Sequence, residues 1–78
     1  MGPIYITIDE EKTAKRIVEL MKKNNIKVPA IAEACGYISL QSVYKWRKGE
    51  SIPGIDNLIV LSELFHESMD NIIVRKRA

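Results

Sequence analysis

The segment Ile31–Gly49 constrains the fold most strongly, because it predicts two short helices joined by a tight turn. The first helix ends at Gly36, and glycine readily takes the positive φ with which helices commonly end. The second begins after Ser39, a preferred N-cap residue, and stops at the glycine that closes the segment. Val43 and Trp46 are three residues apart, so both point to one side of this second helix. The segment therefore predicts a helix-turn-helix unit.

Apolar residues at helical spacing predict further helices on both sides of this segment. One covers residues 10 to about 24 after the N-cap Asp9, and one follows the loop 51–54. Val28 begins the helix that ends at Gly36, with Pro29 tolerated in its first turn. Ser68 is placed to cap a last turn. The predicted inward stripes are Ala14, Ile17, Val18 and Met21 in the first helix, and Ile55, Leu58, Leu61, Leu64 and Phe65 in the fourth.

Both ends of the chain carry β-branched residues. Ile4–Ile8 predicts a short strand or extended arm, and Ile72–Val74 is the natural partner strand. The basic Arg75–Arg77 that follows has two interpretations, a disordered solubilising tail or a second contact with phosphate. We therefore expect a β ribbon that joins the terminal segments.

Composition excludes several protein classes. The lone Cys35 cannot form an intramolecular disulfide, which favours a reducing cytoplasm, and it is more simply a small buried hydrophobe than a nucleophile. No apolar run reaches the roughly 18 residues of a membrane span, and residues 1–8 lack a secretory signal. His66 has no partner at metal-ligand or catalytic spacing, so we interpret it as a surface loop residue. We expect no enzymatic activity, no metal and no cofactor.

Charge is distributed unevenly. Lys45, Arg47 and Lys48 are cationic within four residues, whereas residues 50–70 hold five acids and neither Lys nor Arg. Such polarity would orient the molecule toward a phosphate backbone, although two solvated faces would give the same pattern.

An ordered series of residues resembles the Cro and phage-repressor-like (Xre-type) helix-turn-helix family over about residues 13–74. Its motif anchors here are Ala32, Gly36, Val43, Trp46 and Gly49, followed by Ile52-Pro53, Asn57-Leu58, Leu61, Leu64-Phe65 and Met69-Asp70. The turn between the two helices is one residue longer than in the commonest members. The resemblance implies a mainly α, five-helix, lambda-repressor-like domain over residues 1–78, with its helix-turn-helix core at about 28–49.

With Val43 and Trp46 inward, spacing alone places Gln41, Lys45 and Lys48 on the opposite face of the third helix. The resemblance adds that the helix at about 40–48 lies in the DNA major groove. It implies base contacts from Leu40, Gln41, Tyr44 and Lys45, although Tyr44 has a second interpretation as packing against the second helix. Gln41 can pair with adenine, Lys45 can donate to guanine, and Leu40 can meet a thymine methyl. Trp46, on the Val43 side, is interpreted as a core anchor and not as a base-stacking residue.

We expect the phosphate contacts from the second and third helices. They are Ser42, Arg47 and Lys48, together with the backbone at Lys27 and Val28. The predicted function is sequence-specific binding of double-stranded DNA by a small transcriptional regulator, a repressor. A homodimer on a pseudo-palindromic operator is expected, with no membrane or small-molecule ligand. The alternative is a protein-interaction module such as the antitoxin of a toxin-antitoxin pair.

Overall fold

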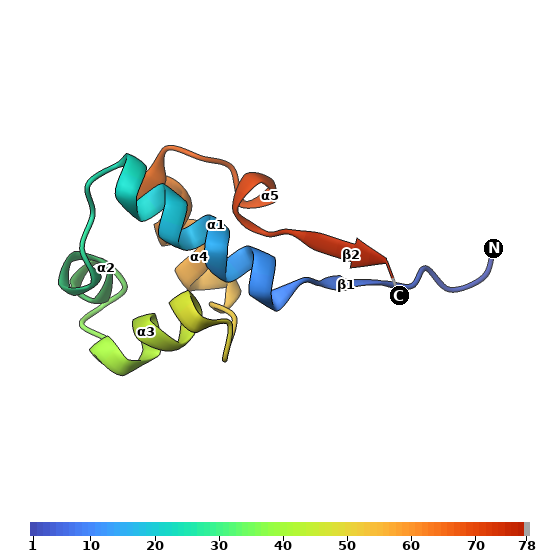
Figure 1. The fold of residues 1–78 in the computed structure, drawn as a ribbon, viewed down its shortest axis with the longest axis horizontal. Helices are drawn as coiled ribbons and strands as arrows, with labels where there is room; N and C mark the ends of the chain where they lie inside the picture. The colour runs from blue at the N-terminus through green and yellow to red at the C-terminus, as the bar shows by residue number, and fades with distance from the viewer. Residues whose placement is uncertain (78) are drawn as a thin grey trace.

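The computed structural model describes residues 1–77, which form five helices and a two-stranded antiparallel sheet. The order along the chain is β1 (Ile6–Ile8), α1 (Glu10–Lys23), α2 (Val28–Ala34), α3 (Leu40–Lys48), α4 (Ile55–Phe65), α5 (Met69–Ile72) and β2 (Arg75–Arg77). Figure 1 shows the helices gathered around α1, with the strands leaving the bundle at the start of that helix. The mainly helical fold class predicted from the sequence is confirmed.

The predicted helix ends are confirmed by the hydrogen bonds that close them. Asp9, Ser39 and Ser68 each accept a hydrogen bond from the backbone N–H three residues further on, at 2.9, 3.2 and 3.3 Å. After α1, Asn25 has a φ of 53°, the left-handed conformation with which helices commonly end. Side-chain oxygens at N-caps satisfy backbone donors that a helix leaves free, so these boundaries are set locally.

A core of apolar side chains from all five helices holds the bundle together. Its fully buried members include Ile17, Leu20, Ile31, Val43, Leu61 and Ile72. Two details of the predicted stripes were wrong. Ile55 is 67% exposed at the start of α4, and Leu20 is buried although it was left out of the α1 stripe. α1 packs against both α3 and α5, so its buried surface is wider than one narrow stripe.

The ribbon forms, but not with the predicted partner strand. Ile6, Thr7 and Ile8 pair with Arg77, Lys76 and Arg75, so β2 is the basic tail and not Ile72–Val74. Ile72 instead closes α5 and is completely buried. Burial of this isoleucine in the core outweighs its β propensity, which is a context-dependent preference. The disordered-tail interpretation of Arg75–Arg77 was therefore wrong.

Thr13 joins the ribbon to the helical bundle. It is the buried polar residue of the core region, and its hydroxyl accepts a hydrogen bond from the Val74 N–H at 3.0 Å. The Asp9 N–H donates to the Val74 carbonyl at 2.8 Å. Both groups of Val74 are thus used at the junction between α1 and β2.

Thr13→Val is expected to lower the free energy of unfolding by about 1–3 kcal/mol, because valine keeps the shape but leaves the Val74 N–H without its acceptor. Urea unfolding followed by circular dichroism measures this change. Thr7→Val is the matched control, since Thr7 is exposed in β1 and should stay within about 0.5 kcal/mol of the native protein. Equal effects of the two substitutions would contradict the role given to Thr13.

Candidate nucleic-acid interface

The third helix is fixed from its inner side by two anchors. Val43 is completely buried and Trp46 is 5% exposed, and both belong to the main core cluster. At the end of α3, Gly49 has a φ of 78°, and a Cβ there would lie 3.3 Å from the Glu10 carbonyl oxygen. A larger residue would be strained by both the backbone and this contact. α3 is therefore held along its whole length against α1 and α2.

The residues expected to face DNA lie on the outer side of α3. Gln41, Tyr44, Lys45 and Lys48 are all exposed, and Leu40 is exposed in the first turn. Tyr44 is 43% exposed, so part of its surface is covered by neighbours and part is free. This pattern agrees with the face predicted from helical spacing.

The turn before α3 contains two successive residues with positive φ, Gly36 at 90° and Tyr37 at 61°. The Ile38 N–H then donates to the Ala32 carbonyl at 3.1 Å, so the chain folds back onto the buried Ala32. A positive φ is uncommon for a residue such as tyrosine. We interpret this pair as the way in which the long turn is accommodated before Ser39 starts α3.

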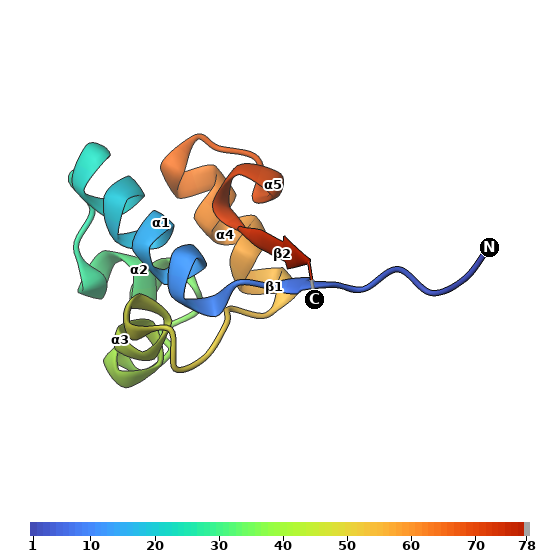
Figure 2. The same ribbon diagram turned by 45° about the vertical axis from the view of Figure 1, so that its right-hand side comes forward.

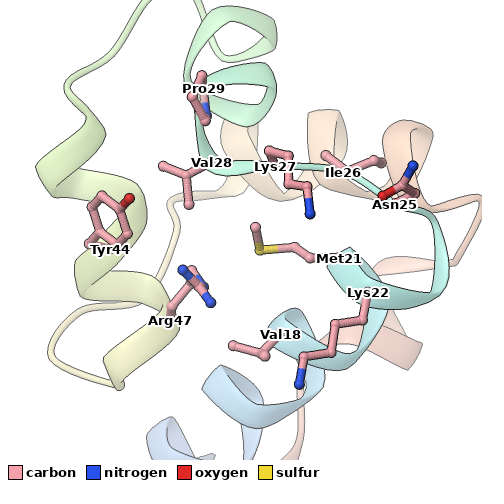
Figure 3. A pocket seen from close by; sticks show the side chains of 10 residues that line it. All are labelled: Val18, Met21, Lys22, Asn25, Ile26, Lys27, Val28, Pro29, Tyr44 and Arg47. Carbon is pink, nitrogen blue, oxygen red and sulfur yellow. The ribbon is translucent and has the colours of Figure 1, made fainter.

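A hollow of about 420 Å³ lies between the end of α1, the start of α2 and the side of α3. Its charged lining residues are Lys22, Lys27 and Arg47, and neither Asp nor Glu lines it. Figure 3 shows Arg47 reaching into this space from α3 and Lys27 reaching into it from the α2 side. The arrangement concentrates positive charge beside the outer face of α3, where an anion would be attracted.

Arg47 is the most distinctive residue of this hollow. Its guanidinium lies 5.8 Å from the centroid of the Tyr44 ring, within the range of a cation–π contact. Its Nε is buried and has no hydrogen-bond partner among the described residues. Because Nε is closed to solvent, an external anion in the hollow would meet the terminal nitrogens of the Arg47 guanidinium.

Four cations outside α3 and the hollow are paired with acids. Within residues 1–77 the ion pairs join Lys15 to Glu11, Arg16 to Glu19, Lys23 to Glu67 and Arg75 to Asp70. None of them includes a cation of α3 or of the hollow. Among the described residues, the cations of α3 and of the hollow therefore remain available to an external anion, together with Lys12 in α1 and Lys76 in β2.

Two residues expected to contact phosphate have competing neighbours. Lys48 lines a second hollow with Asp9, Glu10, Glu11 and Lys76, at the opposite end of α3 from Leu40. Ser42 Oγ lies 2.9 Å from Ser39 Oγ in a hydrogen bond inside the molecule. Val28 is buried in the first turn of α2, where the N-cap Lys27 makes no side-chain cap hydrogen bond. The structure thus brings Lys27 and Arg47 to one hollow and leaves Lys48 near acids.

Sequence reasoning missed Lys22, which joins the cations of the first hollow. It lies in the last turn of α1, where a cation also complements the helix dipole. The short connection 24–27 between α1 and α2 carries the signal that could have found it, because so short a link keeps the end of one helix beside the start of the next.

A family model described as helix-turn-helix matches residues 17–72, which is well over half of the chain. The chain belongs to the Cro/C1-type helix-turn-helix family. This is a family of DNA-binding regulators, so the exposed face of α3 lies on a fold that serves DNA binding. The resemblance stated from the motif residues is confirmed. Comparison with curated proteins and with solved structures gives no match.

The helix-turn-helix protein was also compared with the requirements of metal sites, membrane-spanning helices and reactive side chains. Over the described residues, no group of three or more His, Cys, Asp or Glu side chains is placed to hold a metal ion. Nor does any helix within residues 1–77 have the length and apolarity to span a membrane. His66 caps the end of α4 with a φ of 54° and is exposed. Cys35 is half-buried, and burial raises the pKa of its thiol, which disfavours the reactive thiolate.

Proposed function

We propose that this protein binds double-stranded DNA sequence-specifically, with α3 in the major groove, and regulates transcription as a repressor. The observation that carries the proposal is the joint arrangement of α3 and the cationic hollow beside it. An α-helix fits the major groove, and the exposed side of α3 offers polar side chains at helical spacing. A protein that occupies an operator can repress by blocking access to the DNA, so repression needs no contact with a further protein.

We assign the base contacts to the first two turns of α3. The side-chain oxygen of Gln41 is proposed to accept a hydrogen bond from adenine N6, while its amide nitrogen donates to adenine N7. Lys45 is proposed to donate to guanine O6 or N7. Leu40, exposed in the first turn, is placed to meet a thymine methyl group. Tyr44 stands between the base-contacting side and Arg47, so we propose that it contacts the sugar-phosphate backbone while positioning the guanidinium.

We assign the principal phosphate contact to the hollow. Arg47 and Lys27 would approach one phosphate from two sides, with the terminal guanidinium nitrogens of Arg47 donating to its oxygens. Lys22 adds charge at the edge of the same hollow. We expect smaller contributions from Lys48, whose neighbours are acidic, and from Ser42, whose hydroxyl is already hydrogen-bonded.

One module of this kind covers a small DNA surface, about 600–1,000 Å² by comparison with other single modules. Operator affinity therefore calls for two copies on one site. We propose a two-fold homodimer that binds a pseudo-palindrome whose half-sites lie about 34 Å apart, which is one turn of DNA.

Lys27→Ala is expected to weaken binding about equally on all duplexes and to reduce the slope of log affinity against log salt by about 0.9, because one neutralised phosphate is lost. Fluorescence anisotropy of a labelled duplex over a series of salt concentrations measures both quantities. Lys23→Ala is the matched control: it removes the same charge from a lysine that lies 4.0 Å from Glu67 instead of at the hollow.

The control should retain the native salt slope. Loss of slope in Lys23→Ala equal to that in Lys27→Ala would show that general charge, and not the hollow, holds the phosphate. Failure of the unmodified protein to bind any duplex at low salt would contradict the proposed function itself.

A further inference from the structure

The outer edge of β1 has no strand beside it. The sheet of the described residues consists of β1 and β2 alone, so β2 occupies one edge of β1 and the other is free. Figures 1 and 2 both show the ribbon projecting from the helices, with the extended N-terminal residues continuing beyond it. A free strand edge presents unpaired N–H and C=O groups and is a template for another strand.

The register determines which residues point their backbone groups to this free edge. The Asp9 N–H donates to the Val74 carbonyl, one step beyond the pairing of Ile8 with Arg75. In an antiparallel ladder, residues alternate between those bonded to the partner strand and those that face away. Asp9 and Thr7 thus face β2, and Ile6 and Ile8 direct their backbone groups to the free edge. The same alternation extends to Ile4.

The side chains of these residues also share one face, because alternate residues of a strand point to the same side. Ile4, Ile6 and Ile8 are 69%, 37% and 38% exposed. β1 carries no charge, whereas every residue of β2 is cationic. Two copies that paired through β2 would bring like charges together, which is unfavourable, but pairing through β1 would not.

We propose that β1 pairs antiparallel with β1 of a second copy of this chain, around a two-fold axis at Ile6. Ile6 then lies opposite Ile6 of the partner subunit, and Ile4 lies opposite the partner subunit's Ile8. The sheet becomes four-stranded, with the two basic β2 strands at its outer edges. This pairing names the surface for the homodimer on which the proposed function relies.

Other registers pair fewer isoleucines. An axis at Thr7 would pair Ile6 with Ile8 of the partner subunit, but it would bring Ile4 opposite Glu10, the first residue of α1. An axis at Ile8 would bring Ile6 opposite Glu10, which is the first residue of α1 and is not extended. The axis at Ile6 places only exposed isoleucines opposite one another on this face, and such β-branched pairs stabilise a sheet.

The exposed apolar residues of α4 form a weaker candidate surface. Ile55 and Ile59 are 67% and 46% exposed, but Asp56 and Glu63 lie on the same helix. Residues 50–70 contain neither Lys nor Arg, so a two-fold contact there would bring acids together without an opposing cation. The charge distribution therefore favours the uncharged β1 edge.

Ile6→Lys is the principal test, with mass measured by analytical ultracentrifugation in the absence of DNA. The native protein should self-associate to a dimer, and Ile6→Lys should weaken this association by about tenfold or more, since two lysines would face each other at the axis. Thr7→Lys is the matched control. Thr7 lies on the opposite face of the strand and would oppose Tyr5 of the partner subunit, so this variant should stay dimeric.

Each variant places a lysine opposite a cation of β2, Arg77 for position 6 and Lys76 for position 7, so circular dichroism and thermal unfolding should change slightly and to the same extent in both. A native protein that is monomeric at every concentration would overturn the proposal. A dimer that survives Ile6→Lys would overturn it as well. A dimer that is lost in Ile59→Lys instead would place the contact on α4 and contradict the pairing through β1. Since DNA is absent, these results do not depend on the proposed function.

Cross-linking gives an independent measurement of the register. In a hydrogen-bonded antiparallel pair the Cα atoms are about 5.5 Å apart, a separation that a disulfide can span. Ile6→Cys in a Cys35→Ser background should therefore give a covalent dimer on oxidation, visible by non-reducing electrophoresis. Thr7→Cys in the same background should give far less, and equal cross-linking of the two would contradict the axis at Ile6.

Discussion

Trp46→Ala is expected to lower the free energy of unfolding by about 3–5 kcal/mol, because it removes a large buried side chain and leaves a cavity. Trp46 is 5% exposed and, with Val43, holds the inner side of α3 against the rest of the core. Small proteins have total stabilities of about 5–15 kcal/mol, often toward the lower end. We therefore expect a large unfolded fraction in this variant and a loss of DNA binding that follows from the loss of structure.

Urea unfolding measured by circular dichroism, together with duplex binding, distinguishes this role from base stacking. Trp46→Phe is the control, since it keeps an aromatic ring in the core and should lose much less stability than the alanine variant. If Trp46→Ala stayed as stable as the native protein and lost only its affinity for DNA, Trp46 would contact DNA and the orientation of α3 would be wrong.

Local signals in the sequence predicted the helices well. Asp9, Ser39 and Ser68 accept hydrogen bonds from residues three positions on, so each helix start depends on a few neighbouring residues. Gly36 and Gly49 have the positive φ expected of them. These features need no knowledge of the rest of the fold.

Features that depend on distant residues were less predictable. The partner of β1 was misplaced because Ile72–Val74 has the composition of a strand, whereas Ile72 is needed in the core and Thr13 fixes the chain at Val74. Propensity describes a strand's composition but does not determine its register.

The same distinction applies to the site. Helical spacing was sufficient to place Gln41 and Lys45 on the exposed side of α3. It did not reveal that Lys22 joins Lys27 and Arg47 in one hollow, or that acids at the start of α1 surround Lys48. Those neighbours come from α1, from the N-cap of α2 and from α3, and their positions follow from packing and not from local pattern.

The combined substitution of Gln41 and Lys45 by alanine is expected to remove most of the sequence preference while retaining general affinity for DNA. A good bidentate contact to a base provides about 1–3 kcal/mol of discrimination, so two contacts correspond to a ratio of about 30 to 10⁴ between preferred and random duplexes. Both side chains are exposed, and the variant should therefore unfold at nearly the same urea concentration as the native protein.

Competition between a preferred and a scrambled duplex measures this ratio at one fixed salt concentration. Glu63→Ala, on the exposed surface of α4, serves as the control and should keep the native ratio. A double variant that kept its preference would show that the bases are recognised by other residues, and the assignment of Gln41 and Lys45 would then be wrong.

Selection of bound duplexes from a random pool is the most direct measurement of the central claim that α3 recognises DNA sequence. The native protein should enrich one motif composed of two inverted half-sites about one DNA turn apart. The variant in which Gln41 and Lys45 are both alanine should enrich no motif while still binding the pool. Absence of any enriched motif with the native protein, or the same motif from the double variant, would contradict the claim.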